Sequence, residues 1–198
     1  MYIFSKIVVG AIYSIIFRMK VYGKENLPAT GGCIICSNHS SNHDIVVLGL
    51  TAFKRRPVFM AKKELFKNPI VAWILNGFKP IPVDRDNPGT GTFKKVLEVL
   101  KEGKAFAIYI QGTRKKEIDV ADTKSGVALF ALKSEAPVIP VHIQSTFKLF
   151  SRINVYIGEA ITFEEYYGKR ARTEDLNTVA EKIMDAIIKL PDEVVVKK

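Results

Sequence analysis

Short apolar runs alternate along this chain with segments in which apolar residues recur at helical spacing. A run of about four to eight apolar residues bounded by turn residues is typical of a strand that is covered on both faces of a sheet. Runs of this kind predict strands at 21–23, 33–36, 58–61, 80–83, 105–110, 138–143 and 154–161.

Two segments outside these strands have helical periodicity. Apolar residues recur at i, i+3, i+4 and i+7 over 93–100, and Gly103 is expected to end that helix. A last amphipathic helix is predicted over 176–190, with Thr173 as its cap and Pro191 as its end.

Two further helices are predicted from other signals. Asn68 followed by Pro69 is typical of a helix start and predicts a helix over 70–75. The apolar stretch 7–17 has cations at both ends and is shorter than the roughly 20 residues that span a bilayer. It suits a helix that lies in the headgroup region of an anionic leaflet, and an ordinary core helix is the alternative.

The alternation of strands and helices predicts an α/β fold. We expect a single-domain sandwich with a central, largely parallel or mixed β-sheet flanked by helices, plus an N-terminal apolar helix. Residues 1–20 are expected to form that membrane-interfacial helix, and residues 21–198 the folded domain.

A run of polar residues, 37–44, separates the predicted strand 33–36 from the apolar start of a predicted helix. The run contains His39 and, five positions later, Asp44. A tight turn here can bring the two side chains within hydrogen-bond reach. A carboxylate that holds one ring nitrogen fixes the tautomer and leaves the other nitrogen free to take a proton. The pair therefore predicts half of a catalytic site.

Three polar or charged turns follow predicted strands, at 38–44, 84–86 and 111–114. The chemistry of open α/β sheets lies at the carboxyl ends of their strands. If the strands are parallel, these three turns share one edge of the sheet.

Several residues near this edge are candidates for binding an anion. Gly112 permits close approach of the backbone, and Thr113 and Arg114 supply donors suited to an oxyanion or a phosphate. Arg85 and Lys62 are cations that follow two other predicted strands. Each of these residues is also compatible with an ordinary solvated turn.

Lysine and arginine (30) outnumber aspartate and glutamate (20), which gives a formal net charge of +10. Such a charge favours an anionic partner: nucleic acid, an acidic membrane surface, or an acidic protein or substrate. Aromatic residues such as Phe106 and Tyr109 lie within apolar strands rather than between the cations, so we predict no nucleic-acid partner.

The cysteines and histidines do not predict a redox or metal site. Cys33 and Cys36 have redox spacing but lie within one apolar strand, where they would point to opposite faces as buried structural thiols. His39 and His43 are four positions apart, but Ser40 stands where a zinc protease has glutamate, and no third ligand is evident. We therefore predict no metal.

Four ordered motifs resemble those of the glycerolipid acyltransferases, specifically the lysophosphatidic acid acyltransferases. That family has Asn-His followed by four variable residues and Asp; a Gly followed by an aliphatic-Asp-Arg; Phe-Pro-Glu-Gly-Thr-Arg; and an apolar Val-Ile-Pro-Val stretch. The matching residues are Asn38, His39 and Asp44; Gly77 and 83–85; 109–114; and 138–141. The resemblance covers roughly residues 21 to 160.

The resemblance implies transfer of an acyl group from a thioester to the free hydroxyl of a lysophospholipid, giving phosphatidate when the acceptor is lysophosphatidate. His39 would be the general base and Asp44 would orient it. The substrate-binding residues it implies are Lys62, Arg85, Gln111, Gly112, Thr113 and Arg114.

It also implies no cofactor, a donor that is either acyl-CoA or acyl carrier protein, and anionic membrane lipids as partners. The protein would sit at the cytoplasmic face of the membrane, peripheral or monotopic.

Two departures from the family pattern bear on these expectations. Gln111 stands where the family usually has glutamate, which keeps the shape and removes a charge. The N-terminus has room for one membrane helix where many relatives have more. The alternatives are therefore an acyltransferase for another acceptor, such as glycerol-3-phosphate or another lysophospholipid, or a catalytically weak lipid-binding relative.

Overall fold

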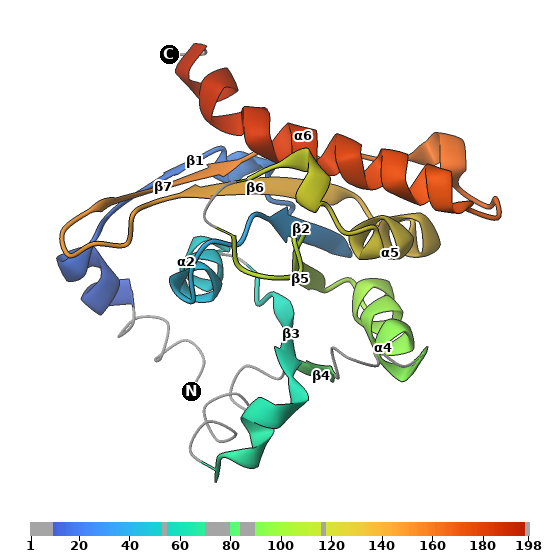
Figure 1. The fold of residues 1–198 in the computed structure, drawn as a ribbon, viewed down its shortest axis with the longest axis horizontal. Coiled ribbons are helices and arrows are strands. Elements are labelled where there is room, and N and C mark those ends of the chain that lie inside the picture. The colour runs from blue at the N-terminus through green and yellow to red at the C-terminus, as the bar shows by residue number, and fades with distance from the viewer. Residues whose placement is uncertain (1–9, 53–54, 70–79, 84–89, 116–117, 197–198) are drawn as a thin grey trace.

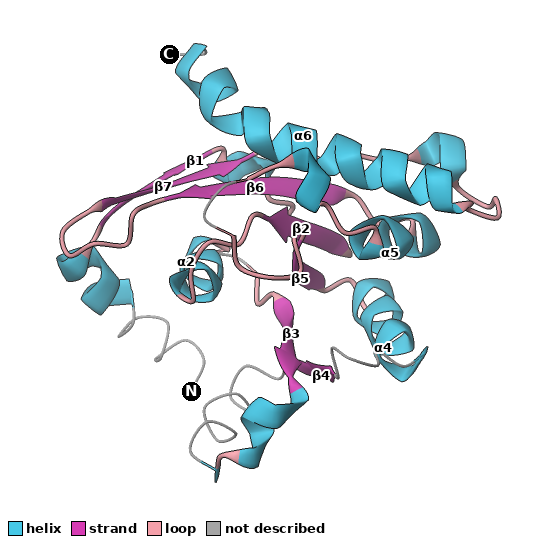
Figure 2. Ribbon diagram, viewed as in Figure 1, coloured by secondary structure: helices cyan, strands magenta, loops and turns pink. Residues whose placement is uncertain are grey.

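The computed structural model describes residues 10–52, 55–69, 80–83, 90–115 and 118–196. Its centre is a seven-stranded sheet with the order β1-β7-β6-β2-β5-β3-β4 (Figures 1 and 2). The strands are β1 (Arg18–Tyr22), β2 (Cys33–Ser37), β3 (Val58–Lys62), β4 (Ile81–Val83), β5 (Ala105–Tyr109), β6 (Val138–Gln144) and β7 (Arg152–Ile157). Each strand overlaps one of the runs from which a strand was predicted.

The sheet is mixed, as predicted. Strands β6, β2, β5, β3 and β4 are parallel to their neighbours in that order, whereas β7 is antiparallel to β6 and parallel to β1. The five parallel strands therefore end at one edge, which brings the turn after β2 next to the turn after β5.

Helices cover both faces of the sheet. Helix α2 (His43–Thr51) packs on one face, together with the helical segment 10–16. Helices α4 (Thr90–Lys101), α5 (Gly126–Ser134) and α6 (Thr173–Val196) pack on the other (Figure 1). Short 3-10 turns occupy Lys24–Asn26, Lys63–Lys67, Val120–Asp122 and Glu164–Tyr166.

The two cysteines confirm the alternation expected of a strand. Cys33 belongs to the core on the α2 face, and Cys36 to the core under α4, α5 and α6. Both thiols are free and fully buried. Burial raises the pKa of each thiol, so neither is a ready nucleophile.

The prediction that Pro191 ends the last helix is wrong, because α6 continues to Val196 with the proline inside it. Proline has no N–H to donate to the carbonyl four residues earlier, which is that of Ile187. His142 replaces the missing donor, since its Nδ1 donates to the Ile187 carbonyl at 2.8 Å. A tertiary contact thus satisfies the group that would otherwise disfavour a helix here.

Three other predictions concern where a strand or helix begins and ends. Strand β7 ends at Ile157, and Ile161 instead forms an isolated bridge with Val138. The helix predicted over 70–75 lies outside the described residues. Helical structure at 10–16 covers part of the apolar stretch 7–17, and the division of the chain at residue 20 stays a prediction. Among the described helices, none is both long and apolar enough to cross a bilayer.

Candidate active site

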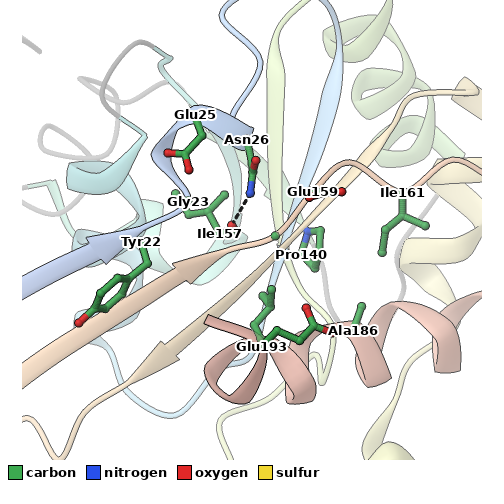
Figure 3. A pocket seen from close by; sticks show the side chains of 12 residues that line it. Tyr22, Gly23, Glu25, Asn26, Pro140, Ile157, Glu159, Ile161, Ala186 and Glu193 are labelled. Carbon is green, nitrogen blue, oxygen red and sulfur yellow. Dashed lines mark hydrogen bonds between the residues drawn. The ribbon is translucent and has the colours of Figure 1, made fainter. Parts of the chain in front are cut away.

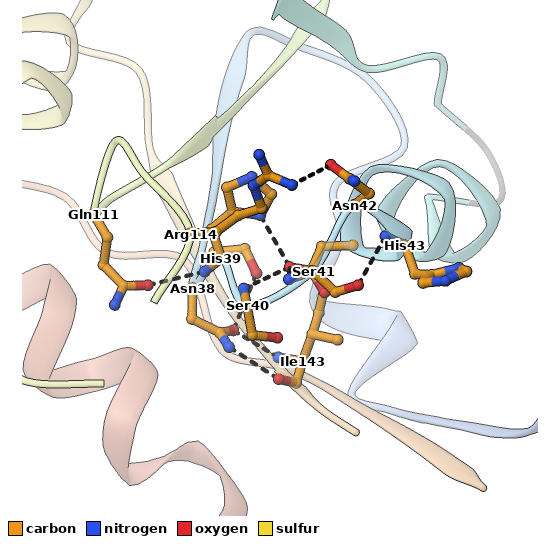
Figure 4. Close-up of polar contacts among 11 residues, drawn as sticks. Asn38, His39, Ser40, Ser41, Asn42, His43, Gln111, Arg114 and Ile143 are labelled. Carbon is orange, nitrogen blue, oxygen red and sulfur yellow. Dashed lines mark hydrogen bonds and ion pairs between the residues drawn. The ribbon is translucent and has the colours of Figure 1, made fainter. Parts of the chain in front are cut away.

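The turn between β2 and α2 is held in place by a buried asparagine. Asn38 donates from Nδ2 to the carbonyl of Ile143 at 2.9 Å, and its Oδ1 accepts the Ile143 N–H at 2.8 Å (Figure 4). The amide thus caps the end of β6, where the backbone would otherwise leave a buried donor and acceptor unpaired. The pair fixes where the chain leaves β2, one residue before His39.

His39 and Asp44 form the hydrogen bond that the sequence predicted. The Nδ1 atom of His39 lies 2.9 Å from Oδ2 of Asp44, and both side chains are buried. A carboxylate can only accept, so Nδ1 carries the proton and Nε2 has the free lone pair. The geometry is that of an oriented imidazole base.

Asp44 is fully buried in the first turn of α2. The same Oδ2 also accepts the backbone N–H groups of Ser40 and Ser41, each at 2.7 Å. Its other oxygen is buried and has no hydrogen-bond partner in the described part of the chain. Three hydrogen bonds to one oxygen fix the position of the carboxylate against the imidazole ring of His39.

The ring of Tyr109, the last residue of β5, stacks on the ring of His39. The two centroids are 4.0 Å apart and the planes differ by 12°. Burial, and then the nearby charge of Asp44, raise the pKa of Tyr109 well above its ordinary value, so it stays a neutral phenol. Stacking on one side and the Asp44 bond at Nδ1 leave the imidazole little freedom to rotate.

Residues of the turn after β5 form hydrogen bonds with both the backbone N–H and the backbone carbonyl of His39. Oε1 of Gln111 accepts the His39 N–H at 2.9 Å, and the Lys115 N–H donates to the His39 carbonyl at 2.8 Å. Gly112 closes the turn at φ +69°, with its own N–H bonded to the Tyr109 carbonyl at 3.1 Å. Glycine adopts this left-handed conformation without steric cost.

Arg114 extends from the same turn to the β2–α2 turn. Its Nη1 donates to Oδ1 of Asn42 at 2.8 Å, and the guanidinium is exposed (Figure 4). Thr113 is exposed beside it. Polar donors are therefore available to an anion at the surface directly beside the buried His39–Asp44 pair.

The structure describes only one of the other two predicted cations. Lys62 is exposed at the end of β3, and its Nζ lies 3.7 Å from a carboxylate oxygen of Glu64. Arg85 lies outside the described residues. No group of three or more metal-ligating side chains occurs in the part of the chain that the structure describes. The nearby His43 is engaged elsewhere, because its Nδ1 is hydrogen-bonded to the hydroxyl of Tyr13 at 2.7 Å.

A separate hollow lies between the sheet and α6, lined in part by Pro140 of β6 and Leu190 of α6 (Figure 3). Glu25, Glu159 and Glu193 also line it. The negative charge of these carboxylates disfavours an anionic ligand such as a phosphate ester. Among the described residues, those that line this hollow include no predicted site residue, so the β2 and β5 turns remain the candidate site.

Comparison with known proteins identifies the family of this chain. A family model described as Acyltransferase matches residues 18–144, which include both turns of the site. The chain belongs to the acyltransferase family. The predicted resemblance is thereby confirmed, and so is the prediction that the protein is an enzyme of this class.

The curated relatives of this acyltransferase include bacterial proteins. A 1-acyl-sn-glycerol-3-phosphate acyltransferase of Bacillus subtilis is 37% identical over 166 residues, which cover 81% of this chain and 82% of that protein. One of the same name from Pseudomonas aeruginosa is 31% identical over 175 residues, covering 83% and 66%. A crystal structure of the 1-acyl-sn-glycerophosphate (LPA) acyltransferase of Thermotoga maritima has a TM-score of 0.72 at 24% identity, covering 94% of this chain and 78% of that one, and shows the same fold.

Two structural supports of the candidate site were not found from the sequence. Pairing of Asn38 with Ile143 joins positions 105 apart, and nothing in the local pattern indicates it. The Tyr109–His39 stack also joins residues from two different strand ends that are far apart in the sequence. The only sequence signal for this stack is an aromatic residue at the end of a strand, next to a polar turn. Many aromatic residues that simply pack in a core have the same signal.

Proposed function

We propose that this acyltransferase moves a fatty acyl group from a thioester to the free hydroxyl of lysophosphatidate, forming phosphatidate in phospholipid biosynthesis. The observation that carries the proposal is the buried His39–Asp44 hydrogen bond at the edge of the sheet. The names of the relatives support the choice of acceptor.

His39 acts as the general base in the proposed reaction. Its Nε2 takes the proton of the acceptor hydroxyl while the hydroxyl oxygen attacks the thioester carbonyl. The C–O bond forms, the C–S bond breaks, and the imidazolium returns its proton to the leaving thiolate. Asp44 holds the tautomer and offsets the positive charge on the ring. The acceptor itself is the nucleophile, so no acyl-enzyme intermediate is required.

Arg114 is the residue that we assign most directly to the phosphate of the acceptor. Its guanidinium is exposed next to the base and tethered by Asn42, which suits a charge-assisted bond to an anionic oxygen. Thr113 and the backbone around Gly112 supply further donors at the same turn. Lys62 and Arg85 are proposed as additional phosphate contacts from neighbouring strand ends.

Gln111 is proposed to organise the site rather than exchange protons. Its Oε1 is used to hold the His39 backbone, a task that needs an acceptor and no negative charge. This bond favours an active enzyme over a catalytically weak lipid-binding relative, which is the alternative that the missing glutamate suggests.

The donor is proposed to be acyl-CoA or acyl carrier protein, and no cofactor takes part. Both donors are anionic and suit a chain with a net charge of +10. The same charge supports anionic lipids as partners and a peripheral or monotopic position at the cytoplasmic face of the membrane.

The test is acyl transfer in mixed micelles with labelled acyl-CoA and labelled acyl carrier protein offered separately. Lysophosphatidate, glycerol-3-phosphate and lysophosphatidylcholine serve as competing acceptors, and the His39→Ala variant sets the background. Labelled phosphatidate from the wild type alone supports the proposal and identifies the donor. Product from another acceptor only would replace lysophosphatidate as the substrate, and no product from any pair would contradict the enzymatic proposal.

A further inference from the structure

At one end of the molecule, the helical segment 10–16 lies next to the loop between β6 and β7 (Figure 1). The Phe150 N–H donates to the Ile16 carbonyl at 2.9 Å, which ties the two segments together. Four large apolar side chains on them are exposed. We call these the apolar tip: Ile12, Ile15, Leu149 and Phe150, exposed by 47%, 75%, 69% and 64%.

The loop has a defined conformation that keeps Leu149 and Phe150 outside the core. Phe147 anchors it, because its ring stacks on His43 at 5.1 Å and meets Phe17 edge-on at 6.2 Å. A turn then follows in which the Ser151 N–H donates to the Lys148 carbonyl at 2.9 Å.

Phe147 and Phe150 both have left-handed backbone conformations, at φ +52° and +60°. A residue other than glycine adopts this conformation at a conformational cost, which the surrounding bonds must offset. The fold therefore holds apolar side chains in water at a cost, instead of leaving them in a loose loop.

Three cations, which we call the basic collar, lie on the segments that adjoin the apolar tip. Arg18 and Arg152 are direct partners across β1 and β7, and Lys148 lies within the loop; all three are exposed. No aspartate or glutamate occurs in residues 1–24 or 136–158. Exposed apolar side chains with cations beside them and no acidic residue nearby in the sequence fit an anionic bilayer, into which the apolar side chains would insert while the cations meet the headgroups.

We propose that the apolar tip and its basic collar insert into an anionic lipid leaflet, with the β6–β7 loop as a second membrane contact beside the N-terminal helix. This deepens the proposed function, on which the choice of a lipid partner rests. The loop is joined to the site: Phe147 packs on His43, which precedes Asp44, and Ile143, near the end of β6 just before the loop, pairs with Asn38. Insertion therefore sets the height of His39 above the lipid surface from which the acceptor comes.

The first test is flotation with phosphatidylcholine vesicles that contain phosphatidylglycerol, compared with pure phosphatidylcholine. The double variant Leu149→Ser, Phe150→Ser should partition at least about tenfold less onto the anionic vesicles, because two large apolar side chains no longer transfer out of water. The matched control is Val120→Ser, another exposed apolar residue, on the α6 side of the fold. It should float as the wild type does.

The collar is tested by Lys148→Ala and Arg152→Ala. Each should weaken binding to anionic vesicles by about fivefold, with a loss that shrinks at high salt. Lys133→Ala, an exposed cation on α5, is the control and should have no effect. Thermal unfolding of every variant must match the wild type.

Insertion is measured directly with an environment-sensitive fluorophore attached to a Phe150→Cys variant. Selective labelling is feasible because both native thiols are fully buried. Anionic vesicles should shift the emission to shorter wavelength at position 150, and leave it unchanged for a label on Val120→Cys. Wild-type flotation with no shift at position 150, or equal flotation of the double variant, would overturn the proposal, as would failure of the wild type to bind anionic vesicles at all.

These outcomes are separable from failure of the proposed function. Turnover of a short-chain, monomeric lysophosphatidate reports on chemistry alone and should be the same in the double variant and the wild type. Vesicle binding without any acyl transfer would contradict the proposed function and leave the insertion surface standing. Acyl transfer together with unchanged vesicle binding in the double variant would contradict the insertion surface and leave the proposed function standing.

Discussion

The backbone N–H of His39 donates to Oε1 of Gln111 at 2.9 Å, across 72 positions of sequence. The residue that departs from the family pattern is therefore the one that fixes the backbone of the proposed base. Either a glutamine or a glutamate oxygen can accept this hydrogen bond, so the bond does not require a charged side chain. The presence of glutamine at position 111 can therefore be tested directly.

We expect Gln111→Glu to keep turnover within about tenfold of the wild type, because a carboxylate oxygen can accept the same hydrogen bond. Gln111→Leu should lower the free energy of unfolding by about 1–3 kcal/mol, since it leaves a buried N–H unpaired. Steady-state kinetics with lysophosphatidate and glycerol-3-phosphate, together with urea unfolding, measure both. Equal loss of turnover in the two variants would show that turnover does not depend on the hydrogen bond accepted by the side-chain oxygen. A change in the preferred acyl acceptor of Gln111→Glu would show that position 111 selects the substrate.

His39→Ala should lower kcat by at least about a hundredfold, as is typical for loss of a general base. The matched control is His142→Gln, which changes a histidine that is bonded to the Ile187 carbonyl of α6 rather than placed in the site. Its turnover should be close to that of the wild type. Near-normal turnover of His39→Ala, with product formation confirmed by chromatography, would remove His39 from the mechanism.

Asn38→Ala should destabilise the fold by about 2–4 kcal/mol, because the buried N–H and carbonyl of Ile143 would both lose their partner and each such loss costs about 1–3 kcal/mol. Asn38→Asp keeps an acceptor for the N–H but places a second acceptor oxygen, on a buried carboxylate, against the Ile143 carbonyl, so it should destabilise the fold at least as much as Asn38→Ala. Asn154→Ala on β7 serves as the control, since its side chain has no hydrogen bond among the described residues. Urea unfolding gives all three values, and equal stability of Asn38→Ala and Asn154→Ala would contradict the structural role.

Arg114→Ala should raise KM for lysophosphatidate by about tenfold and affect kcat less, because a charge-assisted bond to the acceptor contributes about 1.5–3 kcal/mol. Arg172→Ala, an exposed arginine at the start of α6, is the control and should leave KM unchanged. An unchanged acceptor KM in Arg114→Ala would assign the phosphate contact to another cation.

His142 should make stability depend on pH. Burial lowers the pKa of His142 below its ordinary value of 6.5, against smaller opposing effects of the Ile187 carbonyl bond and Asp192. The folded state then binds fewer protons than the unfolded state between the lowered pKa and 6.5, so stability is lost as pH falls through this window. Urea unfolding at neutral pH and at about pH 5 should show a smaller loss in His142→Gln than in the wild type, and equal losses would exclude the histidine as the cause.

The local features of this protein follow from its sequence because they depend on neighbouring residues. Alternating apolar runs and helical periodicities are enough to define the strands and most helices, since each pattern reflects which faces must be covered. The polar run that contains His39 and Asp44 is also local. Both groups lie within one turn, so their hydrogen bond could be expected from spacing alone.

The precise form of the site was decided by contacts between distant segments. Gln111 and Lys115 hold the His39 backbone, Tyr109 stacks on its ring, and Asn38 pairs with Ile143. Each contact requires that strands β2, β5 and β6 lie side by side and end at one edge. Neither the order of strands in a sheet nor the register between them is set by any single segment.

Pro191 shows the same division within one helix. By itself the sequence indicates that the helix ends there, because proline removes a donor to the Ile187 carbonyl. In the folded chain, β6 brings the Nδ1 of His142 to that carbonyl, and the helix continues. Sequence determined the elements and the chemistry available to them, and tertiary packing decided which buried polar groups find partners, because those partners lie far away along the chain.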